Sequence, residues 1–367
     1  MLVYFGLIAI NLYLIFIPNF YKKNIPCSMT FPINLLFIAF FISVFPAYIF
    51  HGQSFVSSMK AYMIFYVFLL YFILFRLQFT YNEIVKICLS LFFISLFIYL
   101  IDYLTLPDAL FSSQNPFERR GTVTIRFSGQ GFTFLGTFYF LSRFCRNGKI
   151  VHFILYILGF CFLILFSGSR IQFLSVVLNT FFVIYFYRKE IKRYFLYIIP
   201  LLAISIVTGI YLLESYVAGL YKLAIEELST FETNIRYEAA RYFTTDFQSN
   251  LVTKILGNGY PATGEYGDLF QVVTNYGFWT ADLGLIGFWV YFGIIGVIAW
   301  LIIFKRIFFW ETDHRNIFVK AYFLNLLLTI VLGYAIFSPG YMITTVLCMF
   351  LFDKNKQDRL LSKEKTS

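Results

Sequence analysis

The sequence is built from long apolar runs separated by short polar segments. A helix that crosses a bilayer needs about 17–25 residues, and most of the runs reach this length. Only 13% of the residues are charged, against about 25% in soluble domains, so the bilayer must be the solvent for most of the chain. We therefore expect an all-α, polytopic transmembrane bundle of about eleven spans, which cover residues 1–20, 31–50, 59–78, 84–106, 129–143, 150–167, 171–187, 194–213, 283–304, 317–337 and 339–352.

The basic residues alternate between the segments that join these runs. Most of the 29 Lys and Arg residues fall on one side of the predicted bundle, and the positive-inside rule makes that side cytoplasmic. The N-terminus is then periplasmic, residues 1–353 form one membrane domain, and residues 354–367 form a basic cytoplasmic tail. The net charge of +10 follows this topology, so we expect no nucleic-acid partner. The first run starts at Met1 without a basic leader, which favours a span over a signal peptide.

One long segment, residues 214–282, lies on the outer side of this topology. Its acidic residues outnumber its basic ones. Residues 221–247 are expected to be helical, the sequence Gly257-Asn-Gly-Tyr-Pro261 to break the chain, and Gly264 and Gly267 to lie in a loop. A loop of this length between membrane helices is more often functional than merely connective. The sequence thus predicts a large, partly helical periplasmic loop.

Several arginines lie on the outer side, against the positive-inside trend. A guanidinium matches phosphate oxygens with two parallel hydrogen bonds, so a phosphate-bearing ligand would explain these residues. The alternative is ion pairing along a helix, between Arg236 and Glu232 and between Arg241 and Glu238. The tight turn Ser167-Gly-Ser-Arg170 also favours an anion, because it exposes amides at a helix start. The candidates are Arg126, Arg170, Arg236 and Arg241.

Asp282 is the best-placed carboxylate for a general base, because it opens the ninth predicted span. The alternative is that Asp282 only caps that helix. Glu238, Glu265 and Asp268 are weaker candidates. We expect His51 to be solvated, His152 to pack in the core and His314 to lie among charges. The scattered cysteines are expected to be small core residues. No spacing suits a metal, and no nucleotide-binding motif is present, so no cofactor is expected.

Five short motifs resemble the superfamily of O-antigen polymerases (Wzy-type) and O-antigen ligases. The resemblance covers residues from about 110 to about 300 of this chain, and such motifs are read as hypotheses. The last motif places glycines where helices approach closely. The motifs are Arg126-Phe-Ser-Gly129, Ser167-Gly-Ser-Arg170, Asn234-Ile-Arg-Tyr237, Leu256-Gly-Asn-Gly259 and the run from Asp282 to Gly296.

The resemblance implies a metal-independent glycosyltransferase of the bacterial inner membrane. Such an enzyme joins oligosaccharide repeat units carried on undecaprenyl pyrophosphate at the periplasmic face, and a chain-length regulator is a further expected partner. Arg126, Arg170 and Arg236 would hold the pyrophosphate. The related ligases carry a histidine in or near the large loop, and this loop has none, which favours the polymerase.

The predicted site therefore combines catalytic and substrate-binding residues. Arg170, Arg236 and Asp282 are the catalytic candidates, with the base open between Asp282 and Glu238. Tyr237 and Tyr260 are expected to stack on sugars, although the membrane interface is the more common place for such rings. The substrate-binding set is Arg126, Arg241, Glu238, Tyr237 and Tyr260. A flippase for lipid-linked sugars is the rival from another class, but no internal repeat supports it.

Overall fold

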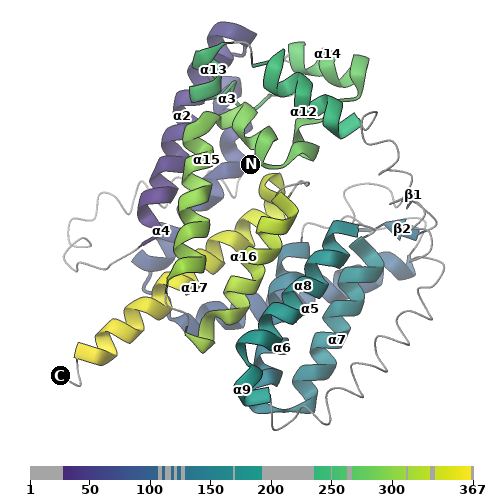
Figure 1. Cartoon of the computed structure of the whole chain (residues 1–367), viewed down its shortest axis with the longest axis vertical. Coiled ribbons are helices and arrows are strands. Elements are labelled where there is room, and N and C mark those ends of the chain that lie inside the picture. The colour runs from purple at the N-terminus through teal and green to yellow at the C-terminus, as the bar shows by residue number, and fades with distance from the viewer. Residues whose placement is uncertain are drawn as a thin grey trace. The chain divides into compact units, whose positions relative to one another are not determined.

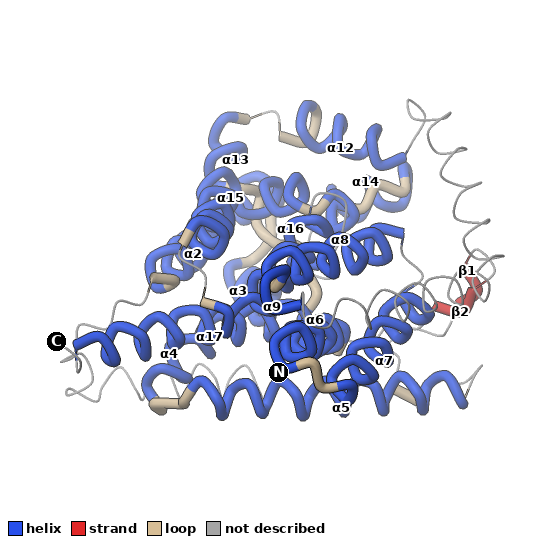
Figure 2. The backbone as a smooth tube through the Cα atoms, turned by 60° about the horizontal axis from the view of Figure 1, so that its bottom comes forward, coloured by secondary structure: helices blue, strands red, loops and turns tan. Residues whose placement is uncertain are grey.

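The structure is a computed structural model, and it shows a helical protein (Figure 1). It describes residues 28–105, 110–111, 117–119, 122–124, 129–167, 170–191, 235–248, 250–262, 267–310, 313–330 and 335–364. Among these, the only strands are β1 (Phe117–Arg119) and β2 (Thr122–Thr124), an antiparallel pair in which Phe117 lies opposite Thr124 (Figure 2). The sequence did not predict this pair.

The first group of helices precedes residue 192. They are α2 (Thr30–His51), α3 (Phe55–Ala61), η1 (Tyr62–Phe68), α4 (Leu69–Arg76), α5 (Tyr81–Leu104), α6 (Gln130–Asn147), α7 (Ile150–Ser167), α8 (Arg170–Phe186) and α9 (Arg188–Ile191). The second group follows residue 234. They are α12 (Ile235–Thr245), α13 (Leu251–Leu256), α14 (Gly267–Tyr276), η3 (Thr280–Leu283), α15 (Leu285–Phe309), η4 (His314–Asn316), α16 (Ile317–Ile330), η5 (Ala335–Phe337) and α17 (Pro339–Glu364).

The described residues contain four helical stretches that are long and apolar enough to cross a bilayer. They are Thr30–His51, Phe55–Arg76, Tyr81–Leu104 and Leu285–Phe309, and shorter apolar helices cover Ile150–Leu163 and Leu174–Phe186. These helices make the chain a membrane protein with several spans. The predicted runs 1–20 and 194–213 lie outside the described residues, so the total of about eleven spans stays a prediction.

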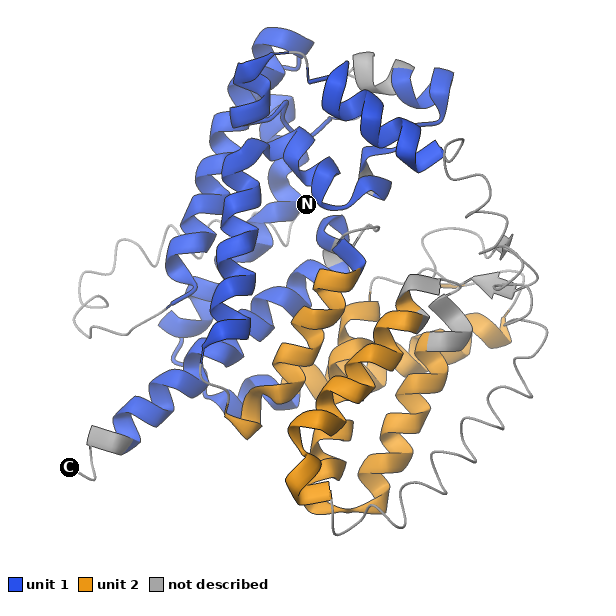
Figure 3. Ribbon diagram, in the orientation of Figure 1, with its two compact units in different colours: residues 1–86, 235–312, 329–367 blue, residues 87–234, 313–328 orange. Residues whose placement is uncertain are grey.

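The chain divides into two compact units (Figure 3). The single membrane domain over residues 1–353 stays a prediction. Unit 1 comprises residues 1–86, 235–312 and 329–367, and unit 2 comprises residues 87–234 and 313–328. Helix α17 continues through the predicted boundary between residues 353 and 354, so the tail is helical as far as Glu364. Each unit is assembled from segments far apart in the sequence.

Unit 2 packs α6, α7 and α8 against one another. These helices approach closely because glycine lies where a neighbouring side chain makes contact. A Cβ added at Gly136 of α6 would lie 2.2 Å from Cδ2 of Phe92, and one added at Gly159 of α7 would lie 2.2 Å from Oγ1 of Thr137. The rings of Phe134 and Phe138, also on α6, are fully buried as well.

Unit 1 packs α15 against α2 and α13, and α17 against η1 and α4. The buried carboxylate of Asp353 joins three of its segments. It accepts hydrogen bonds from the hydroxyl of Ser28, from the backbone N–H of Met29 at 2.8 Å and from the hydroxyl of Tyr71 at 2.6 Å. A buried carboxylate needs such donors to offset its lost hydration. Asp353 therefore fixes the start of α2 and the helix α4 to α17.

Candidate functional site

Helix α15 of unit 1 is broken at Gly293, where φ is 65° and ψ is −173°. A break inside an apolar helix leaves backbone groups that need new partners, because the bilayer core supplies none. The segment after α13 provides them. The N–H of Asn258 donates to the carbonyl of Val290 at 2.8 Å, and the N–H of Gly259 donates to the carbonyl of Tyr291 at 2.9 Å. The amide side chain of Asn258 also donates to Val290, at 3.1 Å.

The crossing of these two segments requires glycine on both sides. A Cβ at Gly257 would lie 2.2 Å from the carbonyl oxygen of Tyr291, and one at Gly293 would lie 2.1 Å from that of Ile255. Gly257 and Gly259 also have φ values of 86° and 80°, which L-residues rarely adopt. The predicted chain break at Gly257 is confirmed, because α13 ends at Leu256. The predicted loop position of Gly267 is wrong, because α14 begins there.

His51 contacts this docked segment. It is the last residue of α2, and its ring is half-buried. Nε2 of His51 lies 3.0 Å from Oδ1 of Asn258, and the ring stacks on Phe247 with centroids 5.5 Å apart and planes 8° apart. The expectation that His51 is merely solvated is therefore wrong. A histidine does meet the large loop, although it comes from a position 207 residues earlier in the chain.

Tyr260 anchors the end of the docked segment. Its N–H donates to the hydroxyl of Tyr62 at 3.1 Å, and its carbonyl accepts from Nε2 of Gln53 at 3.0 Å. Its half-buried ring lies 5.2 Å from those of Phe65 and Tyr291, centroid to centroid. This environment gives Tyr260 a packing role; its predicted contact with sugar stays a prediction.

Helix α12 carries four of the predicted site residues in unit 1. Arg236, Tyr237, Glu238 and Arg241 are all exposed on it, Tyr237 to 50%. The helix packs against η3, which contains the exposed Asp282. The ring of Tyr242 reinforces this contact, since it lies 5.8 Å from that of Phe278. The fold thus brings the α12 arginines and Asp282 onto neighbouring elements.

The structure also bears on the alternatives left open for these residues. Arg241 and Glu238 form no ion pair with each other or with any other described residue, so this explanation of Arg241 fails. Glu232, the proposed partner of Arg236, lies outside the described residues. Helix α15 begins at Leu285 with Gly284 as its N-cap and no side-chain cap. Asp282 as the cap of this helix is therefore wrong, because it lies in a separate turn of 3-10 helix.

The other two predicted arginines are less defined. Arg170 is the first residue of α8 in unit 2, as the sequence predicted, but its side chain, Gly168 and Ser169 lie outside the description. Arg126 also lies outside the described residues. The predicted site residues whose side chains the structure describes all lie in unit 1. They are Arg236, Tyr237, Glu238, Arg241, Tyr260 and Asp282.

The described residues include no group of three or more His, Cys, Asp or Glu side chains that could hold a metal ion. Cys88, Cys145 and Cys348 are buried, which confirms the prediction for them, whereas Cys161 is exposed. The chain matches no protein-family model, no curated protein and no solved structure.

Proposed function

We propose that the chain is a polysaccharide polymerase, which joins O-antigen or capsule repeat units carried on undecaprenyl pyrophosphate. The observation that carries this proposal is the packing of α12, with its exposed Arg236 and Arg241, against the turn that holds Asp282. Guanidinium groups suit a pyrophosphate leaving group, and a neighbouring carboxylate suits a general base. The resemblance of the sequence motifs supports the same activity.

In the proposed reaction, a hydroxyl of the acceptor repeat unit attacks the anomeric carbon of the donor sugar. Asp282 takes the hydroxyl proton, the new glycosidic bond forms, and the bond from the sugar to the pyrophosphate breaks. Arg236 and Arg241 stabilise the negative charge that develops on the departing undecaprenyl pyrophosphate. The exposed rings of Tyr237, Tyr276 and Trp279 offer faces for sugar rings.

The proposal includes a topology of about eleven spans in the bacterial inner membrane, with the 214–282 loop and the N-terminus periplasmic and the C-terminus cytoplasmic. In a variant without native cysteines, Thr245→Cys should react with an impermeant thiol reagent in intact spheroplasts. Lys189→Cys should react only after lysis. Both positions are exposed, so poor access within the fold does not explain a difference. Labelling of position 189 alone in intact spheroplasts would reverse the topology and remove the periplasmic site.

A second candidate function is O-antigen ligation, and His51 favours it. The lack of a histidine in the loop argued against a ligase, but His51 reaches the loop through Asn258 and Phe247. A half-buried imidazole near an acceptor hydroxyl is a suitable base. Polymerase and ligase share the donor and its leaving group, and they differ in the acceptor that receives the chain.

Arg236 on α12 provides the test of the proposed activity. Arg236→Ala should remove one charge-assisted phosphate contact, worth about 1.5–3 kcal/mol, and thus slow polymerisation by about 10–150-fold. Arg236→Lys should recover part of the rate, because lysine keeps the charge but lacks the bidentate fork. The measurement is polymer length together with the amount of single repeat units on the lipid carrier. Arg170→Ala in unit 2 is expected to behave in the same way.

Lys60 provides the matched control for Arg236. It is an exposed basic residue of α3 on the same predicted side of the membrane, and Lys60→Ala should leave polymer length unchanged. Normal polymer from Arg236→Ala would assign a structural role to this arginine. Accumulation of repeat units on the cytoplasmic face instead of the periplasmic face would indicate a flippase.

A further inference from the structure

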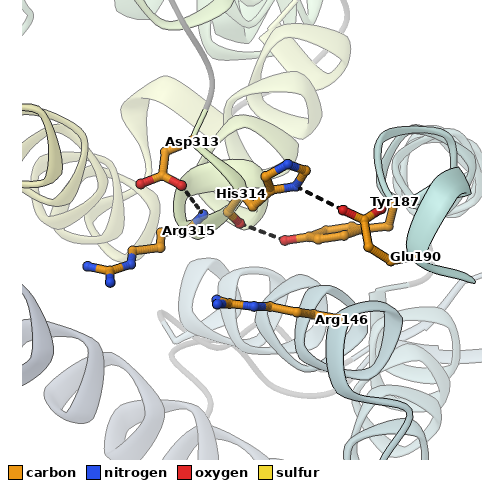
Figure 4. A pocket seen from close by; sticks show the side chains of 6 residues that line it. All are labelled: Arg146, Tyr187, Glu190, Asp313, His314 and Arg315. Carbon is orange, nitrogen blue, oxygen red and sulfur yellow. Dashed lines mark hydrogen bonds and ion pairs between the residues drawn. The ribbon is translucent and has the colours of Figure 1, made fainter. Parts of the chain in front are cut away.

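Unit 2 contains a pocket that the proposed activity does not use (Figure 4). Its volume is about 220 Å³, and it lies at the end of α6, at α9 and at the start of η4. The predicted topology places all three on the cytoplasmic side. The lining residues are Arg146, Tyr187, Glu190, Asp313, His314 and Arg315.

Contacts among the lining residues fix the walls of the pocket. The buried Tyr187 donates its hydroxyl hydrogen to the carbonyl of His314 at 2.6 Å, which holds the end of α8 to η4. Asp313 caps η4 by accepting from the N–H of Arg315 at 3.2 Å. Nδ1 of His314 lies 3.7 Å from Oε1 of Glu190. The pocket is therefore preformed by the ends of these helices.

Two charged groups of opposite sign line it and lack hydrogen-bond partners within the described part of the chain. Arg146 is exposed and forms no hydrogen bond or ion pair with the described residues. The second oxygen of Glu190, Oε2, is buried and accepts no hydrogen bond within the described part of the chain. In Figure 4 the guanidinium groups of Arg146 and Arg315 point toward one side of the view, whereas Glu190 lies on the other. A buried carboxylate oxygen without a donor is costly, so a ligand that supplies one would be stabilised.

The charge pattern selects the class of ligand. A simple anion would be attracted by the two arginines but repelled by Glu190 and Asp313. A simple cation would be attracted by these two carboxylates but repelled by Arg146 and Arg315. A zwitterion satisfies both ends, because phosphate oxygens suit a guanidinium and an ammonium group donates hydrogen bonds to a carboxylate. We propose that this pocket binds a phosphoethanolamine group, with its phosphate on Arg146 and its ammonium on Glu190. A zwitterionic phospholipid of the inner leaflet is one source, since the predicted topology places the pocket at the cytoplasmic surface of the membrane.

Binding to the purified full-length chain in detergent tests this inference independently of polymer synthesis. Native mass spectrometry would compare phosphatidylethanolamine, phosphatidylglycerol and phosphatidylcholine of equal chain length, and soluble phosphoethanolamine with inorganic phosphate. We expect phosphatidylethanolamine to bind most tightly, because choline cannot donate a hydrogen bond to Glu190 and glycerol carries no positive charge. Tight binding of soluble phosphoethanolamine would support the pocket and identify the free compound as the source.

Variants assign the two ends of the ligand. Arg146→Gln should weaken phosphatidylethanolamine binding about tenfold or more, and Glu190→Gln should remove the preference over phosphatidylglycerol. Lys149→Gln removes an exposed positive charge just beyond α6, outside the pocket, and should change neither result. Equal affinity of the wild-type chain for the three lipids, or unchanged binding in Arg146→Gln, would overturn the proposal, whether or not the chain is a polymerase.

Discussion

Gly293→Ala is expected to release the docked segment of the large loop from α15 and to abolish polymer synthesis. The new Cβ would lie 2.1 Å from the carbonyl oxygen of Ile255, at a backbone position with φ of 65°. A backbone with φ of 65° and ψ of −173° is adopted essentially only by glycine, and it costs another residue about 1–3 kcal/mol. The overlap with a backbone atom cannot be relieved by a side-chain rotation, so we expect a total above about 3 kcal/mol. Thermal unfolding in detergent measures this loss.

Gly52→Ala is the matched control for Gly293. Gly52 also has a positive φ, 66°, with ψ of 10° in the left-handed helical region, but a Cβ there would meet nothing within 4 Å. Its replacement should cost only the conformational term of about 1–2 kcal/mol and leave the loop docked. Equal destabilisation by the two substitutions would mean that the crossing of Gly257 and Gly293 contributes little to stability.

Asp282→Asn is expected to insert normally and to lose most of the polymerase activity. The side chain is exposed, and α15 uses Gly284 and no side chain as its cap, so asparagine should leave the fold intact. Loss of a general base costs about 10²–10⁴-fold in rate. Single repeat units should therefore accumulate on the lipid carrier.

His51→Gln separates the two candidate activities in the same assay. Glutamine can still donate a hydrogen bond to Asn258 but cannot serve as a base. If Asp282 is the base of a polymerase, His51→Gln should retain near-normal polymer. If His51 is the base of a ligase, His51→Gln should lose transfer while Asp282→Asn keeps it. Near-normal polymer from Asp282→Asn would remove Asp282 from the mechanism and direct the search to Glu238.

The sequence alone predicted the helices because a bilayer constrains a chain so strongly. Backbone groups in the bilayer core need partners within the chain, so an apolar run of sufficient length becomes a helix. The run 31–50 became Thr30–His51, the run 84–106 became Tyr81–Leu104, and residues 150–167 form Ile150–Ser167. The end of α13 at Leu256 was also predictable, because Gly-Asn-Gly is a strong local break.

The candidate site was predictable only in part. The position of Arg236 and Arg241 on a helix followed from the composition of residues 221–247; within this range the structure describes residues 235–247, and α12 ends at Thr245. The separation of Asp282 from α15 did not, since an acid just before an apolar run is typical of a helix cap. The break at Gly293 was also hidden, because a glycine among apolar residues in a span is equally typical of close helix packing.

The contact of His51 with Asn258 shows what only the tertiary structure decided. Nothing near either residue in the sequence indicates the other, because they lie 207 positions apart. Their meeting depends on the break in α15, whose free carbonyls hold the glycine segment where the end of α2 can reach it. Apolar periodicity and charge bias record how each segment meets lipid or water. They do not record which distant segment supplies the hydrogen bonds that a broken helix lacks. In this protein the segment after α13 supplies them to α15, and this docking places the glycine segment of the large loop against the rest of unit 1.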